Sequence, residues 1–138
     1  MSKKSSDLKF GFDNEKTVLP IIKKFFKDDN IKMYVDKFEV IDFKSDNLIC
    51  ELKSRRINHD QYDTCLFGFN KYEEFKNNNI DSYICYKYID GLFYIKYDEN
   101  KFNTYENKIQ NVWRDGRCEK SRVLLIPIKD LIPLIISS

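Results

Sequence analysis

The 138-residue chain has a formal net charge of +2, and 42% of its residues are hydrophobic and 15% aromatic. The hydrophobic and aromatic content excludes a disordered chain. The length predicts a single domain over residues 1–138, with a loose tail at residues 1–6. The net charge is too small to indicate nucleic-acid binding by itself. Four cysteines lack Cys-x-x-Cys spacing, so no zinc ribbon is indicated, and Cys50 and Cys85 are expected to be buried free thiols. No signal peptide or membrane-spanning run is present, so we expect a soluble, intracellular protein.

The N-terminal part of the chain is predicted to form an amphipathic helix over residues 11–26. Apolar residues recur at helical spacing, at Val18, Ile21, Ile22, Phe25 and Phe26. Pro20 interrupts this pattern, because a proline inside a helix removes one backbone hydrogen bond. The helix therefore either kinks there or begins near Pro20. In the longer version Glu15 lies in the first turn, where the helix dipole favours a carboxylate.

The next predicted element is a β-hairpin that turns at residues 45–48. In this register Asp42 lies opposite Glu51, and directly opposed side chains share one face of a sheet. One face collects the apolar residues Ile41, Phe43, Cys50 and Leu52, and the other carries Asp42, Glu51 and Lys53. Two carboxylates about 5 Å apart with an ammonium beside them can bind a divalent metal next to a phosphate. This geometry points to a metal-dependent nuclease.

Other readings of this segment remain open. The tripeptide Glu-x-Lys occurs four times in the chain, but only Glu51-Leu52-Lys53 ends an apolar strand with an aspartate across a tight turn. A solvated sheet face that carries a surface salt bridge is the alternative interpretation. Asp36 competes with Asp42 as the strand acid, although it would lie about 20 Å from Asp42 along one continuous strand.

The rest of the chain alternates between helix and strand patterns. Residues 63–76 are predicted to be helical and residues 77–79 a loop. The dipeptide Asp90-Gly91 between β-rich runs predicts a hairpin over residues 81–97. Residues 113–122 are predicted to form a loop or hairpin, residues 122–128 a last strand, and residues 129–135 a short helix. The predicted fold class is α/β, with a central mixed sheet of four or five strands flanked by helices.

A helix with a glutamate, a strand with an aspartate and a strand with Glu-x-Lys follow in the order of the PD-(D/E)XK nuclease superfamily, which the chain resembles over roughly its first half. The matching residues are Glu15, Asp42 and Glu51-Leu52-Lys53. The resemblance implies a restriction-endonuclease-like αβββαβ core and Mg²⁺- or Mn²⁺-dependent cleavage of DNA, by an endonuclease with selectivity for DNA structure. It also implies roles for these residues: Asp42, Glu51 and the Leu52 carbonyl hold the metal, Glu15 binds a second metal or a coordinated water, and Lys53 orients the attacking water.

The runs at residues 51–56, 61–64 and 68–71 are also similar to small nuclease-like proteins of large DNA viruses. This resemblance implies the cytoplasm or nucleus of a host cell. The side chains predicted to contact DNA are Arg55, Arg56, Gln61, Lys71, Arg114 and Arg117. The arginines cluster in a chain that otherwise uses lysine, and a guanidinium can bind phosphate through two hydrogen bonds. The single histidine, His59, is predicted to be an ordinary surface residue.

Two other classes of function stay open: a nuclease-like fold that only binds nucleic acid or protein, and an interaction module of unrelated α/β fold. A single site cuts one strand at a time, so cleavage of both DNA strands predicts a homodimer. The candidate interface is the apolar segment around Leu131, Pro133 and Ile135, although core packing explains this segment equally well.

Overall fold

The computed structural model describes residues 17–36 and 39–134. Its helical elements are α2 (Val18–Phe26), α3 (Phe69–Lys76), α4 (Glu99–Phe102) and the 3-10 turn η1 (Ile128–Asp130). A six-stranded sheet, called sheet A here, has the strand order β1 (Lys32–Asp36), β2 (Glu39–Lys44), β3 (Leu48–Ser54), β5 (Asp81–Tyr88), β6 (Gly91–Lys96) and β9 (Ile132–Pro133). A three-stranded sheet, sheet B, has the order β4 (Thr64–Gly68), β8 (Arg117–Pro127) and β7 (Asn107–Arg114).

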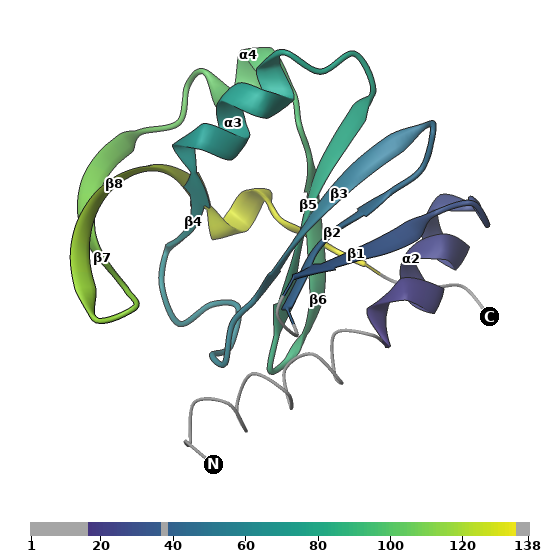
Figure 1. The fold of residues 1–138 in the computed structure, drawn as a ribbon, viewed down its shortest axis with the longest axis horizontal. Coiled ribbons are helices and arrows are strands. Elements are labelled where there is room, and N and C mark those ends of the chain that lie inside the picture. The colour runs from purple at the N-terminus through teal and green to yellow at the C-terminus, as the bar shows by residue number, and fades with distance from the viewer. Residues whose placement is uncertain (1–16, 37–38, 135–138) are drawn as a thin grey trace.

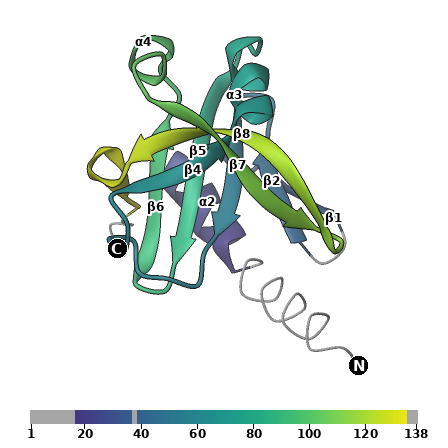
Figure 2. The same cartoon turned by 90° about the vertical axis from the view of Figure 1, so that its left-hand side faces the viewer.

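Sheet A is the middle layer of the molecule (Figure 1), with α2 on one face and sheet B and α3 on the other. Viewed from the side of sheet B, strands β7 and β8 cross in front of sheet A (Figure 2). Each face of sheet A has its own apolar cluster, because successive side chains of a strand point to opposite faces. In β5, for example, Ile84 and Tyr86 belong to the cluster under sheet B, whereas Cys85 belongs to the cluster under α2.

Sheet A contains both parallel and antiparallel pairs. Strands β1, β2 and β3 form an antiparallel meander, and β5 then pairs in parallel with β3. Parallel neighbours need a crossover connection, and here the chain passes through β4 and α3 on its way from β3 to β5. The fold is therefore mixed α/β with a mixed sheet, as expected, although sheet A has more strands than predicted and sheet B was not foreseen as a separate sheet.

Helix α2 begins at Val18, so Pro20 lies in its first turn, where a missing N–H costs no helical hydrogen bond. Of the two alternatives for this helix, the start near Pro20 is the one observed. Val18 and Ile22 are buried against sheet A, and Lys27 ends the helix in a left-handed conformation.

Two predicted helices differ from the structure: one is shorter than predicted, and the other is replaced by other elements. Residues 64–68 form strand β4, and only residues 69–76 are helical. The apolar residues of this segment fit either period, and in the structure Cys65 and Phe67 alternate with less buried neighbours, as in a strand. Near the C-terminus, a 3-10 turn and the short strand β9 replace the helix predicted over residues 129–135, as far as residue 134, where the described part of the chain ends.

The hairpin predictions were confirmed. Strands β5 and β6 form the predicted hairpin, with Tyr88 paired to Gly91 across the turn residues Ile89 and Asp90. The segment predicted as a loop or hairpin lies in the β7–β8 hairpin, which turns at Asp115-Gly116 with positive φ at both residues. Cys50 and Cys85 are buried free thiols whose sulfur atoms lie 2.6 Å apart, and burial raises the pKa of Cys50 well above its usual range. No helix in the described part of the chain is long and apolar enough to cross a lipid bilayer.

Candidate active site

The β2–β3 hairpin brings two carboxylates together on one face of sheet A. Asp42 pairs with Glu51, and Phe43 pairs with Cys50, so the predicted register is confirmed. Asp42 and Glu51 are only 5% and 4% exposed, which is rare for charged residues unless they are paired. The alternative of a solvated charged face therefore does not describe these two positions, because α3 and sheet B lie over this side of sheet A (Figure 1).

Two lysines from different elements flank Glu51. The Nζ atom of Lys53, on the same strand, lies 3.5 Å from Oε1, and the Nζ atom of Lys71, on α3, lies 3.7 Å from Oε2. Gln61 and Lys71 were both predicted to reach this region, and the structure brings Lys71 to Glu51. Gln61 lies exposed in the loop after β3, where its N–H donates to the carbonyl of Asn58.

The charges of this group are incompletely balanced. Burial raises the pKa of Glu51, Lys53 and Lys71 oppose that rise, and the nearby charge of Asp42 adds to it. Asp42 forms an ion pair with Lys44, whose Nζ atom lies 3.6 Å from Oδ2. Its other oxygen, Oδ1, is buried and has no hydrogen-bond partner among the described residues. An unpaired carboxylate oxygen in the interior is costly, and a bound cation would satisfy it.

The other three acids and ligands considered for this site are Leu52, Asp36 and Glu15, and each has a different outcome. The Leu52 side chain is buried in the cluster under α2, so only its backbone can take part, and that backbone lies next to the Asp42–Glu51 pair. Asp36 and Asp42 lie on separate strands, β1 and β2, so the prediction that one strand joins them was wrong. Tyr34 rather than Asp36 pairs with Asp42, and Asp36 is not adjacent to Glu51. Glu15 lies outside the described residues.

The four arginines predicted to contact DNA fall in two places. Arg55 and Arg56 are exposed directly after β3, on the course of the chain that leads away from Lys53. Arg114 and Arg117 form the last pair of the β7–β8 hairpin, and Arg117 is exposed. This hairpin lies on the same side of sheet A as α3 and Lys71 (Figure 1).

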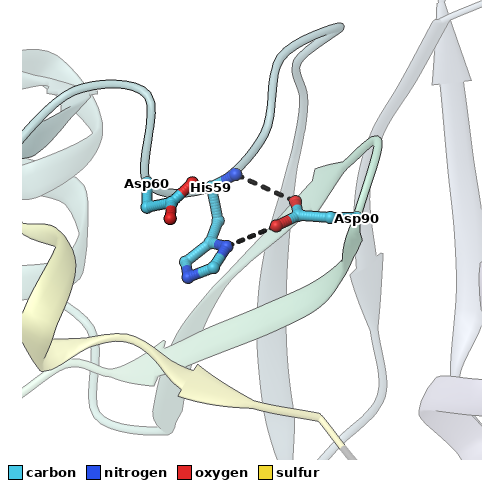
Figure 3. A group of neighbouring side chains, drawn as sticks. All are labelled: His59, Asp60 and Asp90. Atoms are coloured by element: carbon cyan, nitrogen blue, oxygen red, sulfur yellow. Dashed lines mark hydrogen bonds and ion pairs between the residues drawn. The ribbon is translucent and has the colours of Figure 1, made fainter.

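A second polar group was missed at the sequence level (Figure 3). His59, Asp60 and Asp90 each place one potential ligand atom within 4.8 Å of the others. His59 is held by Asp90, which accepts from its backbone N–H at 2.9 Å and contacts Nδ1 at 2.5 Å. His59 is therefore a fixed residue rather than an ordinary surface histidine. The two partners are 31 residues apart in the chain, so no local pattern predicts this contact. The one weak signal in the sequence was the predicted turn that contains Asp90.

The candidate dimer segment is divided between core and surface. Leu131 is buried in the cluster under sheet B, as the core-packing alternative expected, whereas Pro133 is exposed on β9. Ile135 lies outside the described residues.

Comparisons with protein-family models, with curated proteins and with solved structures found no match for this chain.

Proposed function

We propose that this protein is a metal-dependent nuclease that hydrolyses DNA phosphodiester bonds at the Asp42–Glu51 pair. The observation that carries the proposal is the pair itself: two buried, directly opposed carboxylates and two flanking ammonium groups, with one carboxylate oxygen that has no hydrogen-bond partner in the described part of the chain. A buried carboxylate oxygen without a hydrogen-bond partner among the described residues, beside a glutamate whose pKa burial raises, supports a functional site at this pair.

The donor set fits a hard divalent cation. Mg²⁺ and Mn²⁺ prefer carboxylate and carbonyl oxygens, and Asp42, Glu51 and the backbone carbonyl of Leu52 would provide them. When bound, such an ion polarises a phosphoryl oxygen and lowers the pKa of a coordinated water. It would also offset the charge that burial makes costly on Glu51.

The chain's own groups supply the remaining chemistry. The Lys53 ammonium, half exposed and beside Glu51, can hold the attacking water and offset the negative charge that develops on the phosphoryl oxygens. The Lys71 ammonium, on the other side of Glu51, adds positive charge where a DNA phosphate would sit. Arg55 and Arg56, just beyond the strand, can bind the flanking phosphates.

The order of elements gives further support. Helix α2, the meander β1–β2–β3, helix α3 and the parallel strand β5 follow the αβββαβ order that the resemblance implies, with β4 inserted before α3. The acid-bearing strands β2 and β3 are neighbours in this order, and α3 carries the lysine that reaches them.

Metal binding and cleavage test the proposal. Mn²⁺ should raise the melting temperature of the wild type and of Asp81→Asn, which removes an exposed strand carboxylate paired with Lys96, but not that of Glu51→Gln. With Mn²⁺, the wild type should cut at least one member of a panel of duplex, single-stranded, nicked and branched DNAs. A wild type that neither gains stability from Mn²⁺ nor cuts any of these DNAs would refute the proposal, and a protein that binds DNA without cutting would be a binding module.

A further inference from the structure

A pocket of about 270 Å³ lies beyond the end of β3, and of the residues used in the proposed function only Arg55 lines it. Its wall is formed by the loop after β3, the start of β4, the end of β5 and residues of β7 and η1. The lining residues are Arg55, Ile57, His59, Tyr62, Thr64, Cys65, Leu66, Tyr88, Lys108 and Ile128. The charged side chains of the lining are those of Arg55 and Lys108, which can bind an anionic group, while the carboxylates of Asp60 and Asp90 lie next to His59 outside the lining.

The loop that forms one wall is held in place by the end of β5. The N–H of Arg55 donates to the carbonyl of Lys87 at 2.9 Å, and the N–H of Ile89 donates to the carbonyl of Ile57 at 3.0 Å. The His59 ring stacks on Phe93, with a centroid separation of 4.4 Å. Asp90 fixes the Nδ1 side of this ring, and Nε2 points away from Asp90 (Figure 3). The wall is therefore formed before any ligand arrives.

The chemistry of the lining suits a nucleotide. Arg55 and Lys108 offer charged donors for a phosphate. Tyr62 is 57% exposed, and its ring is free to stack on a base. Burial raises the pKa of Tyr88, so its hydroxyl stays protonated at neutral pH and remains a donor. Ile57, Leu66 and Ile128 supply apolar surface. Apolar lining with a few polar groups is usual in pockets that bind small molecules.

The pocket lies on the same face of sheet A as the proposed metal site. Lys53 pairs with Tyr86 in the β3–β5 ladder, and the hydrogen bond from Arg55 to Lys87 continues that ladder by one step. Arg55 and Tyr88 therefore lie on the same face as Glu51 and Lys53. Arg55 is four residues from Glu51, or about 13 Å along the strand at ~3.3 Å per residue. A DNA strand with one phosphate at the carboxylates can thus reach the pocket a few nucleotides away.

We propose that this pocket binds one unpaired nucleotide of the substrate strand, with its phosphate at Arg55 and Lys108 and its base against Tyr62. The inference rests on the proposed function, because it assigns the substrate class of the same site. A base inside a duplex is stacked and paired, so only a nucleotide in a single strand, a flap or a frayed end can enter. The enzyme should therefore prefer DNA with an unpaired stretch beside the cleaved bond.

The test measures nucleotide binding directly, by calorimetry on the full chain with EDTA present. The probe is deoxyadenosine 5′-monophosphate, with deoxyadenosine and inorganic phosphate as partial ligands. The wild type should bind the monophosphate saturably and more tightly than either partial ligand. Tyr62→Ala should weaken binding at least about fivefold, the low end for a lost base–aromatic stack, whereas Tyr34→Ala, which removes another exposed tyrosine, should not. Lys108→Ala should weaken the monophosphate but not the nucleoside, and Lys101→Ala should change neither.

These results separate the pocket from the nuclease activity. Lys53→Ala should keep nucleotide binding while losing cleavage, and Tyr62→Ala should still cut DNA but with a smaller preference for flapped over fully paired substrates. No saturable binding at millimolar monophosphate, or equal binding of inorganic phosphate alone, would overturn the pocket inference whether or not the protein cuts DNA. Nucleotide binding by a protein that cuts no DNA would instead support the pocket and refute the nuclease.

Discussion

Lys71 on α3 and Glu51 on β3 are joined by an ion pair, with Nζ of Lys71 3.7 Å from Oε2 of Glu51. The same ammonium lies 3.2 Å from Oε2 of Glu74, one turn along the helix. Burial alone would lower the pKa of Lys71, but Glu51 and Glu74 raise it by more, so the side chain stays charged at neutral pH. A helix that is separated from β3 by a whole strand thus supplies a charge to the proposed metal site.

Loss of the Lys71 charge should have opposite effects on metal binding and on cleavage. Lys71→Ala removes a positive charge that competes with a cation for Glu51, so Mn²⁺ should bind several-fold more tightly. Cleavage should fall roughly tenfold or more, because a donor near the phosphate is lost. Lys76→Ala, on the same helix but stacked over Tyr72, is the matched control. Calorimetry and a cleavage assay provide the two readouts, and weaker Mn²⁺ binding by Lys71→Ala would contradict the assigned geometry.

Lys53 should be needed for chemistry and not for folding. Its side chain is 40% exposed, and a half-exposed ion pair contributes at most about 1 kcal/mol to the free energy of unfolding. Lys53→Ala should therefore melt within a few degrees of the wild type and still bind Mn²⁺, while cleavage falls by a factor of about 100 or more. Lys96→Ala, which removes another paired strand lysine, should cut normally. Undiminished cleavage by Lys53→Ala would rule out the proposed mechanism.

The metal-free protein should lose stability as the pH rises through the pKa of Glu51. Folding raises this pKa above its ordinary value of 4.5, chiefly through burial. The folded state therefore favours the protonated form, and that contribution is present below pH 4.5 and lost as the pH rises through the folded-state pKa. Glu51→Gln stays neutral and should be at least as stable as the wild type at pH 7. Urea unfolding at several pH values, in EDTA, measures the difference, and a strongly destabilised Glu51→Gln at pH 7 would mean that the lysines outweigh burial.

Asp28 should give a pH dependence of the opposite sign. Its Oδ2 accepts from the Ser45 hydroxyl at 2.6 Å, which ties the β2–β3 turn to the loop after α2. This hydrogen bond lowers the pKa of Asp28 below 3.8, so its stabilising contribution is present above that value and is lost as the pH falls through the folded-state pKa. Asp28→Asn should be less stable than the wild type at pH 7, and the two should converge in acid. Asp29→Asn, which replaces an exposed neighbour, is the matched control.

Arg55 and Arg56 should contribute to DNA affinity without sequence preference. Both are exposed directly after the strand that carries Lys53. If each meets one phosphate, Arg55→Ala/Arg56→Ala should lower the slope of log K against log salt by about two. Lys23→Ala/Lys24→Ala, on α2 at the opposite face of sheet A, serves as the control. Fluorescence anisotropy in Ca²⁺ at several salt concentrations measures the slopes, and equal slopes for the two double variants would exclude these phosphate contacts.

The sequence alone determined the local pairing that matters most for the proposed site. The register of Asp42 against Glu51 follows from alternation along two strands and a short turn, and both are properties of a dozen neighbouring residues. The hairpin over residues 81–97 was equally predictable, because a turn signal separates two β-rich runs. The structure puts its turn at Ile89 and Asp90, one residue before the predicted Asp90-Gly91, and neither turn residue has positive φ. The sequence left two alternatives for the first helix, a kink at Pro20 or a start near Pro20. The structure decides for the second, because α2 begins at Val18.

The tertiary structure decided what covers that pair and what surrounds it. Lys71 reaches Glu51 only because the chain crosses over through β4 and α3 before β5 pairs with β3, and no local pattern specifies that crossover. The secondary structure of residues 64–68 could not be predicted from the sequence either, because a short apolar run fits a buried strand and a helix equally well. The burial of Asp42 and Glu51, and the contact of His59 with Asp90, depend on packing between segments far apart in the chain, which periodicity and spacing do not encode.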